Sequence, residues 1–298
     1  ALDGGVNFVD TADVYSHGES EEIVGKALRG RRDHVVLATK FHARMGDDPN
    51  MAGNSRRWIQ LACEASLRRL GTDWIDLYQA HRHDPDVDHE ETLGALSDLV
   101  HAGKVRYLGS STFPASAIVE AQWAAERRGL ERYVCEQPPY SIFARGVEAD
   151  ILATCRRFRM GVIAWSPLNT GWLTGKYRRG QEPPPGSRGA RNWGNRFTTP
   201  ESERKLDLVE ELLKLASDLG VALTHLAQAW VVRHPAVTSA IIGPRTMEQL
   251  TDSLAGHDVV LDDATLDRID ELVAPGTNVN PGDAGWTSPA LSAAARRR

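Results

Sequence analysis

Residues 7 to 15 read Asn7-Phe8-Val9-Asp10-Thr11-Ala12-Asp13-Val14-Tyr15, a short apolar run that ends in an aspartate and a polar loop. Two later apolar runs end in the same way, one at Lys40 and one at His81. In a parallel α/β protein the carboxyl ends of the strands share one face, and active sites are built there. If these runs are neighbouring strands, Asp10, Tyr15, Lys40 and His81 meet in one cleft. A carboxylate, a phenol, an ammonium and an imidazole are sufficient for proton transfer to a carbonyl oxygen.

The composition is typical of a soluble globular protein. The chain has 298 residues, of which 41% are hydrophobic and 25% are charged. Its net charge of -5 argues against nucleic acid or an anionic membrane as the main partner. No apolar run approaches the ~20 residues of a membrane span. The three widely spaced cysteines fit neither a disulfide framework nor a zinc site, so we expect a reducing, cytoplasmic location.

Seven apolar runs alternate with amphipathic segments along the chain. Because these runs are continuously apolar rather than alternating, they indicate parallel strands buried on both faces. We expect strands at residues 6–10, 35–40, 74–81, 107–111, 134–137, 161–166 and 238–242. We expect helices at residues 19–29, 55–70, 92–102, 114–128, 147–158, 201–219, 224–234, 247–255 and 262–273.

This alternation predicts an α/β fold, a (β/α)8 TIM barrel in one domain at residues 1–275, followed by a weakly ordered tail at residues 276–298. Seven βα units do not close an eight-stranded barrel, and residues 1–5 look like the end of a helix with a glycine stop. We therefore expect the barrel to be truncated at the N-terminus, with its first unit missing. The segment 180–200, rich in Gly, Pro and Arg, is longer than a usual connection and predicts a lid, a substrate loop or a mobile loop.

The chain resembles the aldo-keto reductase family at Asp10-Thr11-Ala12-x-x-Tyr15, at Lys40 and at His81. Similarity continues in the segments 71–78, 103–111, 137–141 and 164–168, and the order of these motifs makes the resemblance highly specific. It implies a barrel that transfers hydride from NADPH, or from NADH as the alternative, to an aldehyde or ketone. One departure is Ser111-Thr112, where the family often has Ser-Asn, because threonine can hydrogen-bond a carboxamide less fully than asparagine.

Each residue of the predicted catalytic set has a role that the resemblance supports. Tyr15 is the candidate general acid: a free phenol titrates near ~10, and a neighbouring ammonium stabilises its anion. Lys40 is the candidate ammonium, paired with Asp10, and His81 can donate to the substrate oxygen. Singly, each residue has an ordinary explanation, such as a loop cap for Asp10 or a solvated Lys40. Their combination at three strand ends favours catalysis.

No Gly-x-Gly-x-x-Gly follows a strand, so the sequence does not support a Rossmann site. The resemblance implies instead a cofactor that extends across the barrel mouth. Trp165 corresponds to the aromatic residue that stacks on the nicotinamide, with a core or rim tryptophan as the alternative. Arg245 is the candidate contact of the 2′-phosphate, at a helix N-terminus that favours an anion, or else a plain surface arginine. The other implied contacts are Ser111 and Gln137 for the carboxamide, Ser166, Leu168, Gly171 and Leu173 for the pyrophosphate, Gly243 beside Arg245, and Gln249, Asp252 and Ser253 for the adenine.

Two readings other than a reductase remain open. One is a cofactor-binding regulatory or interaction subunit with little turnover, as in the potassium-channel β-subunit branch that the chain resembles. The other is an inactive truncated fragment with open strand edges. We predict no metal site, because the candidate ligands lack metal-binding spacing on a shared element: His42, His83 and His89. Three aromatic residues are candidates for lining a substrate pocket or for pinning the long loop: Trp172, Trp193 and Phe197. The sequence leaves the carbonyl substrate and the oligomeric state open.

Overall fold

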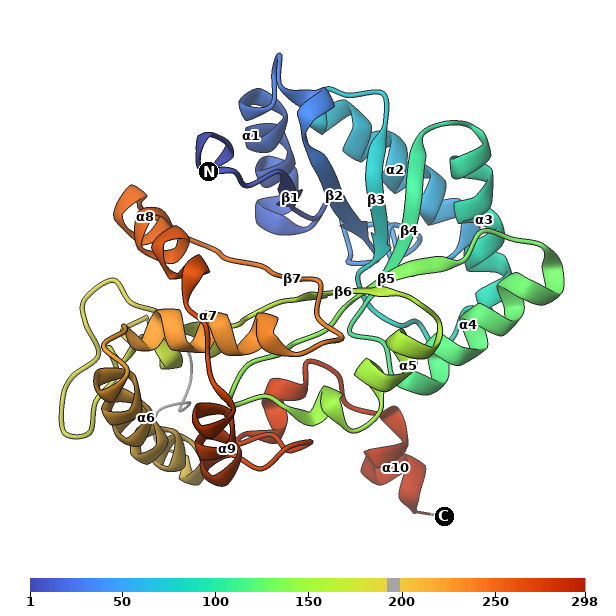
Figure 1. Ribbon diagram of the computed structural model, residues 1–298. Helices are drawn as coiled ribbons and strands as arrows, with labels where there is room; N and C mark the ends of the chain where they lie inside the picture. The colour runs from blue at the N-terminus through green and yellow to red at the C-terminus, as the bar shows by residue number, and fades with distance from the viewer. Residues whose placement is uncertain (192–198, 298) are drawn as a thin grey trace. The chain divides into compact units, whose positions relative to one another are not determined.

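The protein forms two compact units in the computed structural model, which describes residues 1–191 and 199–297 (Figure 1). Unit 1 comprises Ala1–Gln137 and Thr154–Gly161, and unit 2 comprises Pro138–Ala153 and Val162–Arg298. Helix α5, at Ile151–Arg157, begins in unit 2 and ends in unit 1.

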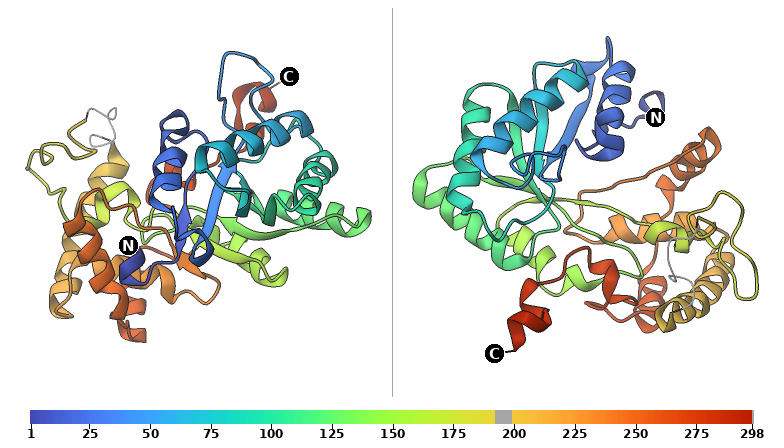
Figure 2. Two further views of the ribbon diagram at one scale, coloured as in Figure 1. Left: turned by 90° about the horizontal axis from the view of Figure 1, so that it is seen from above. Right: turned by 180° about the vertical axis from the view of Figure 1, so that it is seen from behind.

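Unit 1 contains five parallel strands that pair in chain order. They are β1 (Phe8–Asp10), β2 (Val36–Phe41), β3 (Ile75–Ala80), β4 (Val105–Ser111) and β5 (Tyr133–Gln137). The helices between them are α1 (Glu19–Ala27), α2 (Arg56–Leu70), α3 (His89–His101) and α4 (Ala115–Arg128), with 3-10 turns at Leu2–Gly4, Tyr15–Gly18 and Arg32–His34. In Figure 2, α1 to α4 follow one another along the strands, so the strands are covered by helices, as their apolar runs predict.

The strand register brings the polar strand ends of unit 1 to one edge. Asp10 lies opposite Ala38 on β2, and Lys40 lies opposite Gln79 on β3. At the far side of the sheet, Ser111 lies opposite Gln137. Because all these pairs are parallel, the loops that follow the strands gather at the same edge, where an α/β protein builds its site.

Unit 2 contains a second parallel strand pair, β6 (Gly161–Ala164), whose first residue belongs to unit 1, and β7 (Ser239–Ala240). Its helices are α6 (Pro200–Asp218), α7 (Leu223–Arg233), α8 (Met247–Ala255), α9 (Asp263–Leu272) and α10 (Ala293–Arg296). Its 3-10 turns are η4 (Gly146–Glu148), η5 (Asn169–Thr174), η6 (Gly256–Asp258), η7 (Pro281–Ala284) and η8 (Pro289–Leu291). The described residues thus hold seven parallel strands, each followed by a helix, and the prediction of an α/β fold with seven βα units is confirmed.

Most helices lie within two residues of their predicted bounds, and two differ more for reasons of hydrogen bonding. Helix α3 begins at His89 rather than residue 92, because the Asp88 carboxylate caps it by accepting from the Glu90 N–H at 2.6 Å. The predicted helix 147–158 is divided into η4 and α5. The Gly146 N–H there donates to the Asn278 side chain at 2.8 Å, a contact distant in sequence that no local pattern predicts.

No single helix in residues 1–191 and 199–297 has both the length and the apolar composition needed to cross a membrane. Helices α6 and α7 meet this criterion only as a pair, and they are bent by 90° at the break between them. Their apolar faces are buried in the protein, including Leu208, Leu212 and Leu226.

Candidate active site

A buried ion pair lies at the carboxyl ends of β1 and β2. The Lys40 ammonium donates to Asp10 Oδ2 at 2.6 Å and to the Thr11 carbonyl oxygen at 2.8 Å. The Lys40 side chain is fully buried, and that of Asp10 is 8% exposed. Asp10 Oδ1 accepts from Gln79 Nε2 at 3.3 Å and from Gln137 Nε2 at 2.8 Å. These polar contacts offset part of the free energy that both ions lose on leaving water.

Tyr15 and His81 lie beside this ion pair. Lys40 Nζ is 5.1 Å from the centroid of the Tyr15 ring, and the Tyr15 and His81 ring centroids are 5.8 Å apart in an edge-on arrangement. Tyr15 is 41% exposed, so a ligand can reach its ring. Burial, followed by the charges of Lys40 and Arg82, lowers the pKa of His81 to about 3. The imidazole is therefore neutral near pH 7 and carries one N–H donor.

The structure thus brings together all four residues of the predicted catalytic set. Their elements explain this: Asp10 ends β1 and Lys40 lies on the adjacent β2. His81 directly follows β3, and Tyr15 begins the 3-10 turn that comes after the β1 loop. A proton donor, a neutral hydrogen-bond donor and a buried ammonium lie side by side. Such a group can polarise a carbonyl oxygen and transfer a proton to it.

Two of the predicted cofactor contacts belong to the same unit. Ser111 is buried, and its hydroxyl donates to the Gln137 carbonyl oxygen at 2.9 Å. The Gln137 amide is occupied by Asp10, as described above. In this structure Gln137 is therefore a support for the ion pair, a function that the sequence analysis did not assign to it.

The other ten predicted cofactor contacts lie in unit 2, on three segments. Trp165 follows β6 and forms a parallel bridge with Pro139. Ser166, Leu168, Gly171 and Leu173 occupy the turn after β6 and η5, where Leu173 is fully buried. Near α8, the Arg245 N–H donates to Gln249 Oε1 at 2.8 Å. Two side chains of α8 form hydrogen bonds with α7: Asp252 with His225, and Ser253 with Gln228. Gly243 is exposed in the segment that precedes α8.

In the turn after β6, the backbone at Gly171 lies against the side chain of Lys176. Gly171 has a φ of 100°, and a Cβ at this position would lie 2.9 Å from Lys176 Nζ. A glycine here therefore lets the backbone approach the Lys176 ammonium closely, where a side chain would crowd it.

The aromatic candidates for the substrate pocket divide between described and undescribed parts of the chain. Trp172 is buried, with its ring edge-on to Tyr177 at 5.4 Å between centroids. Trp193 and Phe197 lie outside the described residues. Among residues 1–191 and 199–297, no group of three or more His, Cys, Asp or Glu side chains is arranged to hold a metal ion.

The sequence profile of the Aldo/keto reductase family matches residues 1–274, nearly the whole chain. The chain belongs to this family. It is 37% identical to a probable voltage-gated potassium channel subunit beta of Arabidopsis thaliana, over 91% of this chain and 84% of that protein. It is 38% identical to an uncharacterized oxidoreductase of Bacillus subtilis, over 98% of this chain and 88% of that protein. It is 31% identical to a versiconal hemiacetal acetate reductase of Aspergillus parasiticus, over 95% of this chain and 87% of that protein.

The sequence analysis missed one residue of this aldo/keto reductase site. Gln79 lies on β3, is fully buried, and donates to Asp10. It precedes His81 by two positions, and residues two apart in an extended strand project to the same side. This spacing of two residues could have predicted that Gln79 lies on the same side as His81.

A second buried acid lies between Asp10 and Tyr15 in the loop that follows β1. Asp13 is fully buried, and its N–H donates to the Lys40 carbonyl oxygen at 3.1 Å. Burial, followed by the nearby Glu21 carboxylate, raises the pKa of Asp13 from 3.8 to about 7. Between these two pH values the native reductase keeps a proton on Asp13 that the unfolded chain has released. Stability from Asp13 is thus present in full below pH ~4 and is lost as pH rises to ~7.

We expect Asp13→Asn to increase the free energy of unfolding by about 2–3 kcal/mol more at pH 8 than at pH 5, because the amide never ionises in its buried site. Urea denaturation of both proteins at the two pH values measures this difference. Asp33→Asn removes an exposed carboxylate from the same unit and serves as the control. An equal effect of Asp13→Asn at pH 5 and pH 8 would show that Asp13 does not change its protonation over this range.

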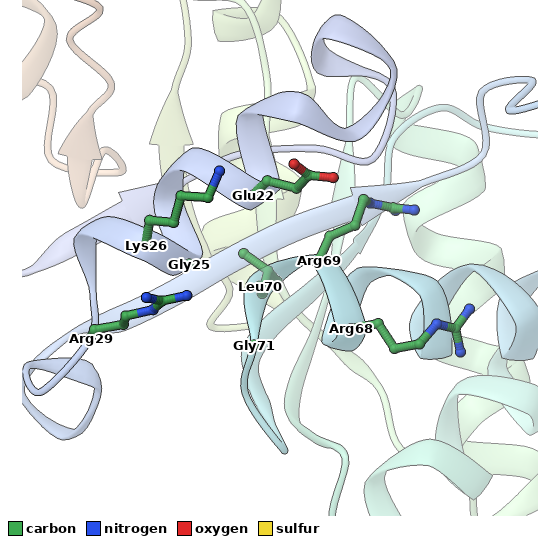
Figure 3. Close-up of a pocket in the computed structure, with 8 residues that line it drawn as sticks. All are labelled: Glu22, Gly25, Lys26, Arg29, Arg68, Arg69, Leu70 and Gly71. Atoms are coloured by element: carbon green, nitrogen blue, oxygen red, sulfur yellow. The ribbon is translucent and has the colours of Figure 1, made fainter.

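A hollow of about 360 Å³ lies elsewhere in unit 1, beside α1 and α2 (Figure 3). Its lining includes four cations, Lys26, Arg29, Arg68 and Arg69, but none of the predicted site residues. In Figure 3, Arg68 and Arg69 extend away from Lys26 and Arg29, so the cations do not converge on one point. Lys26 lies in the last turn of α1, and Arg68 and Arg69 lie in the last turn of α2, where basic residues stabilise the carbonyl end of a helix.

Proposed function

We propose that this aldo/keto reductase reduces an aldehyde or ketone with NADPH, with NADH as the alternative donor. The observation that carries this proposal is the contact of four groups in unit 1: Lys40 paired with Asp10 at 2.6 Å and placed 5.1 Å from the Tyr15 ring, which meets His81 edge-on. The membership of a family of oxidoreductases supports the same reaction class.

In this mechanism the residues of unit 1 act on the carbonyl oxygen. The chemistry that a reduced nicotinamide supplies when bound is hydride transfer to the carbonyl carbon. Neutral His81 donates a hydrogen bond to the carbonyl oxygen and orients it. Tyr15 donates its hydroxyl proton to the same oxygen as negative charge develops there. The Lys40 ammonium stabilises the negative charge on the Tyr15 oxygen after the proton has left, and Asp10 holds Lys40 in place.

In the same proposal the residues of unit 2 hold the cofactor. The Gly171 backbone and the Lys176 ammonium close to it suit the pyrophosphate. Arg245 is exposed next to Thr246, the N-cap of α8, and suits the 2′-phosphate that distinguishes NADPH from NADH. Trp165 is partly exposed after β6 and suits the nicotinamide face.

Loss of nicotinamide absorbance tests the reaction directly. The purified protein is mixed with NADPH or NADH and a panel of aldehydes and ketones, and the absorbance band of the reduced nicotinamide is followed. We expect NADPH to be consumed with at least one carbonyl class and at a higher kcat/KM than NADH. A protein that binds NADPH but oxidises none of it across a broad panel would contradict the reductase proposal.

The second candidate is a cofactor-binding regulatory subunit with little turnover. It is favoured by the 35–37% identity to probable or putative potassium channel β subunits of plants and a fission yeast. This candidate predicts tight NADPH binding, negligible carbonyl reduction and a stable protein partner. The same assay, combined with titration of NADPH binding by fluorescence, separates the two candidates.

A further inference from the structure

The turn after β6 contains three non-glycine residues in the left-handed region of φ. They are Ser166, Asn169 and Thr170, with φ of 59°, 44° and 57°. Left-handed backbone costs free energy for residues with a side chain, and it persists where surrounding contacts hold it. The surrounding contacts therefore determine the shape of this turn, which in the proposed function binds the cofactor phosphates.

The central residue of this turn is held by a buried polar group. Asn169 is 4% exposed, and its amide donates to Asp283 Oδ2 at 3.1 Å and to Ser141 Oγ at 3.3 Å. Its side-chain oxygen Oδ1 accepts from Lys205 Nζ at 2.8 Å. Lys205 donates in addition to the same Asp283 oxygen at 2.6 Å. Asp283, Lys205 and Asn169 thus close a triangle in which each residue contacts the other two.

Aromatic rings surround the ammonium of this triangle. Lys205 Nζ lies 5.5 Å from the Trp172 ring and 5.9 Å from the Phe143 ring. Lys205 itself is 3% exposed. In such a poorly hydrated site an ammonium depends on its anionic partner, so Asp283 is the residue that keeps Lys205 in position against Asn169.

Asp283 reaches this site from a segment that is anchored along η4. Residues 276–279 make hydrogen bonds of 2.8–2.9 Å to residues 143–148, namely Gly276 to Glu148, Arg145 to Thr277, Gly146 to Asn278, and Val279 to Phe143. Turn η7 follows, and its residue Asp283 then meets Asn169 and Lys205. Asp283 lies beyond residues 1–274, which the family profile matches.

We propose that Asp283 is a positioning residue, which acts through Asn169 and Lys205 to hold the turn 166–171 in the shape that accepts the cofactor pyrophosphate. Residues 276–283 form a strap that carries Asp283 to the turn. The assignment of the pyrophosphate to this turn rests on the proposed function, whereas the restraint of the turn by Asp283 does not. A purely structural ion pair would change stability but would leave cofactor binding by the folded protein unaltered.

Two substitutions of Asp283 separate its charge from its hydrogen bonds. Asp283→Ala removes both, and Asp283→Asn keeps an acceptor oxygen but no charge. We expect Asp283→Ala to raise the Kd and KM for NADPH by about 3- to 30-fold, the range typical of residues that act through another, while kcat changes little. Asp283→Asn should give a smaller rise. Binding of adenosine 2′-phosphate, which lacks the pyrophosphate, should be unchanged in both variants.

The matched control is Asp207→Asn. Asp207 lies on the same helix as Lys205, α6, and forms an exposed ion pair with Arg179 that this substitution breaks. It should leave the Kd for NADPH unchanged. Thermal unfolding is recorded for every variant, and the binding comparison is made well below the midpoint. If Asp283→Ala does not fold, the comparison of Asp283→Asn with the wild type decides the question.

Amide hydrogen exchange tests the restraint without any cofactor. Asp283→Ala should speed exchange in residues 166–175 but not in residues 75–80 of β3, which lie in the other unit. Unchanged exchange in 166–175 would overturn the proposal, and so would faster exchange with an unchanged Kd for NADPH. If the wild-type protein binds no NADPH, the proposed function fails, and the exchange result still decides whether Asp283 holds the turn.

Discussion

Replacing Tyr15 by phenylalanine is expected to lower kcat for carbonyl reduction by about 10²–10⁴-fold, the contribution typical of a positioned general acid. Phenylalanine keeps the ring that packs edge-on against His81 and lies near the Lys40 ammonium. It removes only the hydroxyl that is proposed to donate the proton. Tyr15 is 41% exposed, so the substitution leaves no buried polar group unsatisfied, and the free energy of unfolding should change little.

Steady-state kinetics and NADPH titration together check this result. The Kd for NADPH should stay within about twofold, because the proposed cofactor contacts do not include Tyr15. Tyr107→Phe is the matched control: Tyr107 is 62% exposed on β4, and its hydroxyl has no place in the mechanism. Turnover by Tyr15→Phe at the wild-type rate would show that the proton comes from another group, and His81→Gln would then be the next variant to measure.

Local signals explain why most of the fold could be predicted. Helix α2 begins after Ser55, whose hydroxyl accepts from the Trp58 N–H, and it ends at Gly71, which has a φ of 62°. Both residues are readable in the sequence, because a serine N-cap and a left-handed glycine are the usual ends of a helix. Helix α8 also has the predicted bounds, and its N-cap is Thr246, whose side chain accepts from the Gln249 N–H. Strands β1, β3, β6 and β7 are shorter than predicted, whereas β4 and β5 begin one or two residues earlier than predicted, because an apolar run does not say where pairing starts or stops.

Long-range contacts explain what the sequence does not reveal about the site. The Gln137 amide donates to Asp10 across 127 positions in the chain, and Asp283 meets Asn169 across 114. The pKa of Asp13 depends on burial and on Glu21 of α1. No residue pattern encodes these distances. The strand-end rule did place Asp10, Tyr15, Lys40 and His81 at one edge, and their catalytic roles stay a prediction that kinetics must test.

Lys40→Met is expected to lower the free energy of unfolding by about 3–5 kcal/mol, the usual result of removing one partner from a buried ion pair. Methionine resembles lysine in length and flexibility, so little packing is lost. The Asp10 carboxylate, 8% exposed, would be left with the two glutamine amides as its remaining side-chain donors. Turnover should also fall severely, since the ammonium 5.1 Å from the Tyr15 ring is gone. Urea denaturation and steady-state kinetics measure the two effects.

The double variant Lys40→Met with Asp10→Asn separates stability from catalysis. Removing both charges leaves no unpaired ion in the buried site, so the double variant should be more stable than Lys40→Met alone. It should remain inactive, because neither change restores an ammonium beside Tyr15. Lys26→Met, at an exposed position of α1, is the control and should change the free energy of unfolding by less than about 0.5 kcal/mol. If turnover returns together with stability in the double variant, Lys40 acts only through folding, and its proposed role in the proton transfer is wrong.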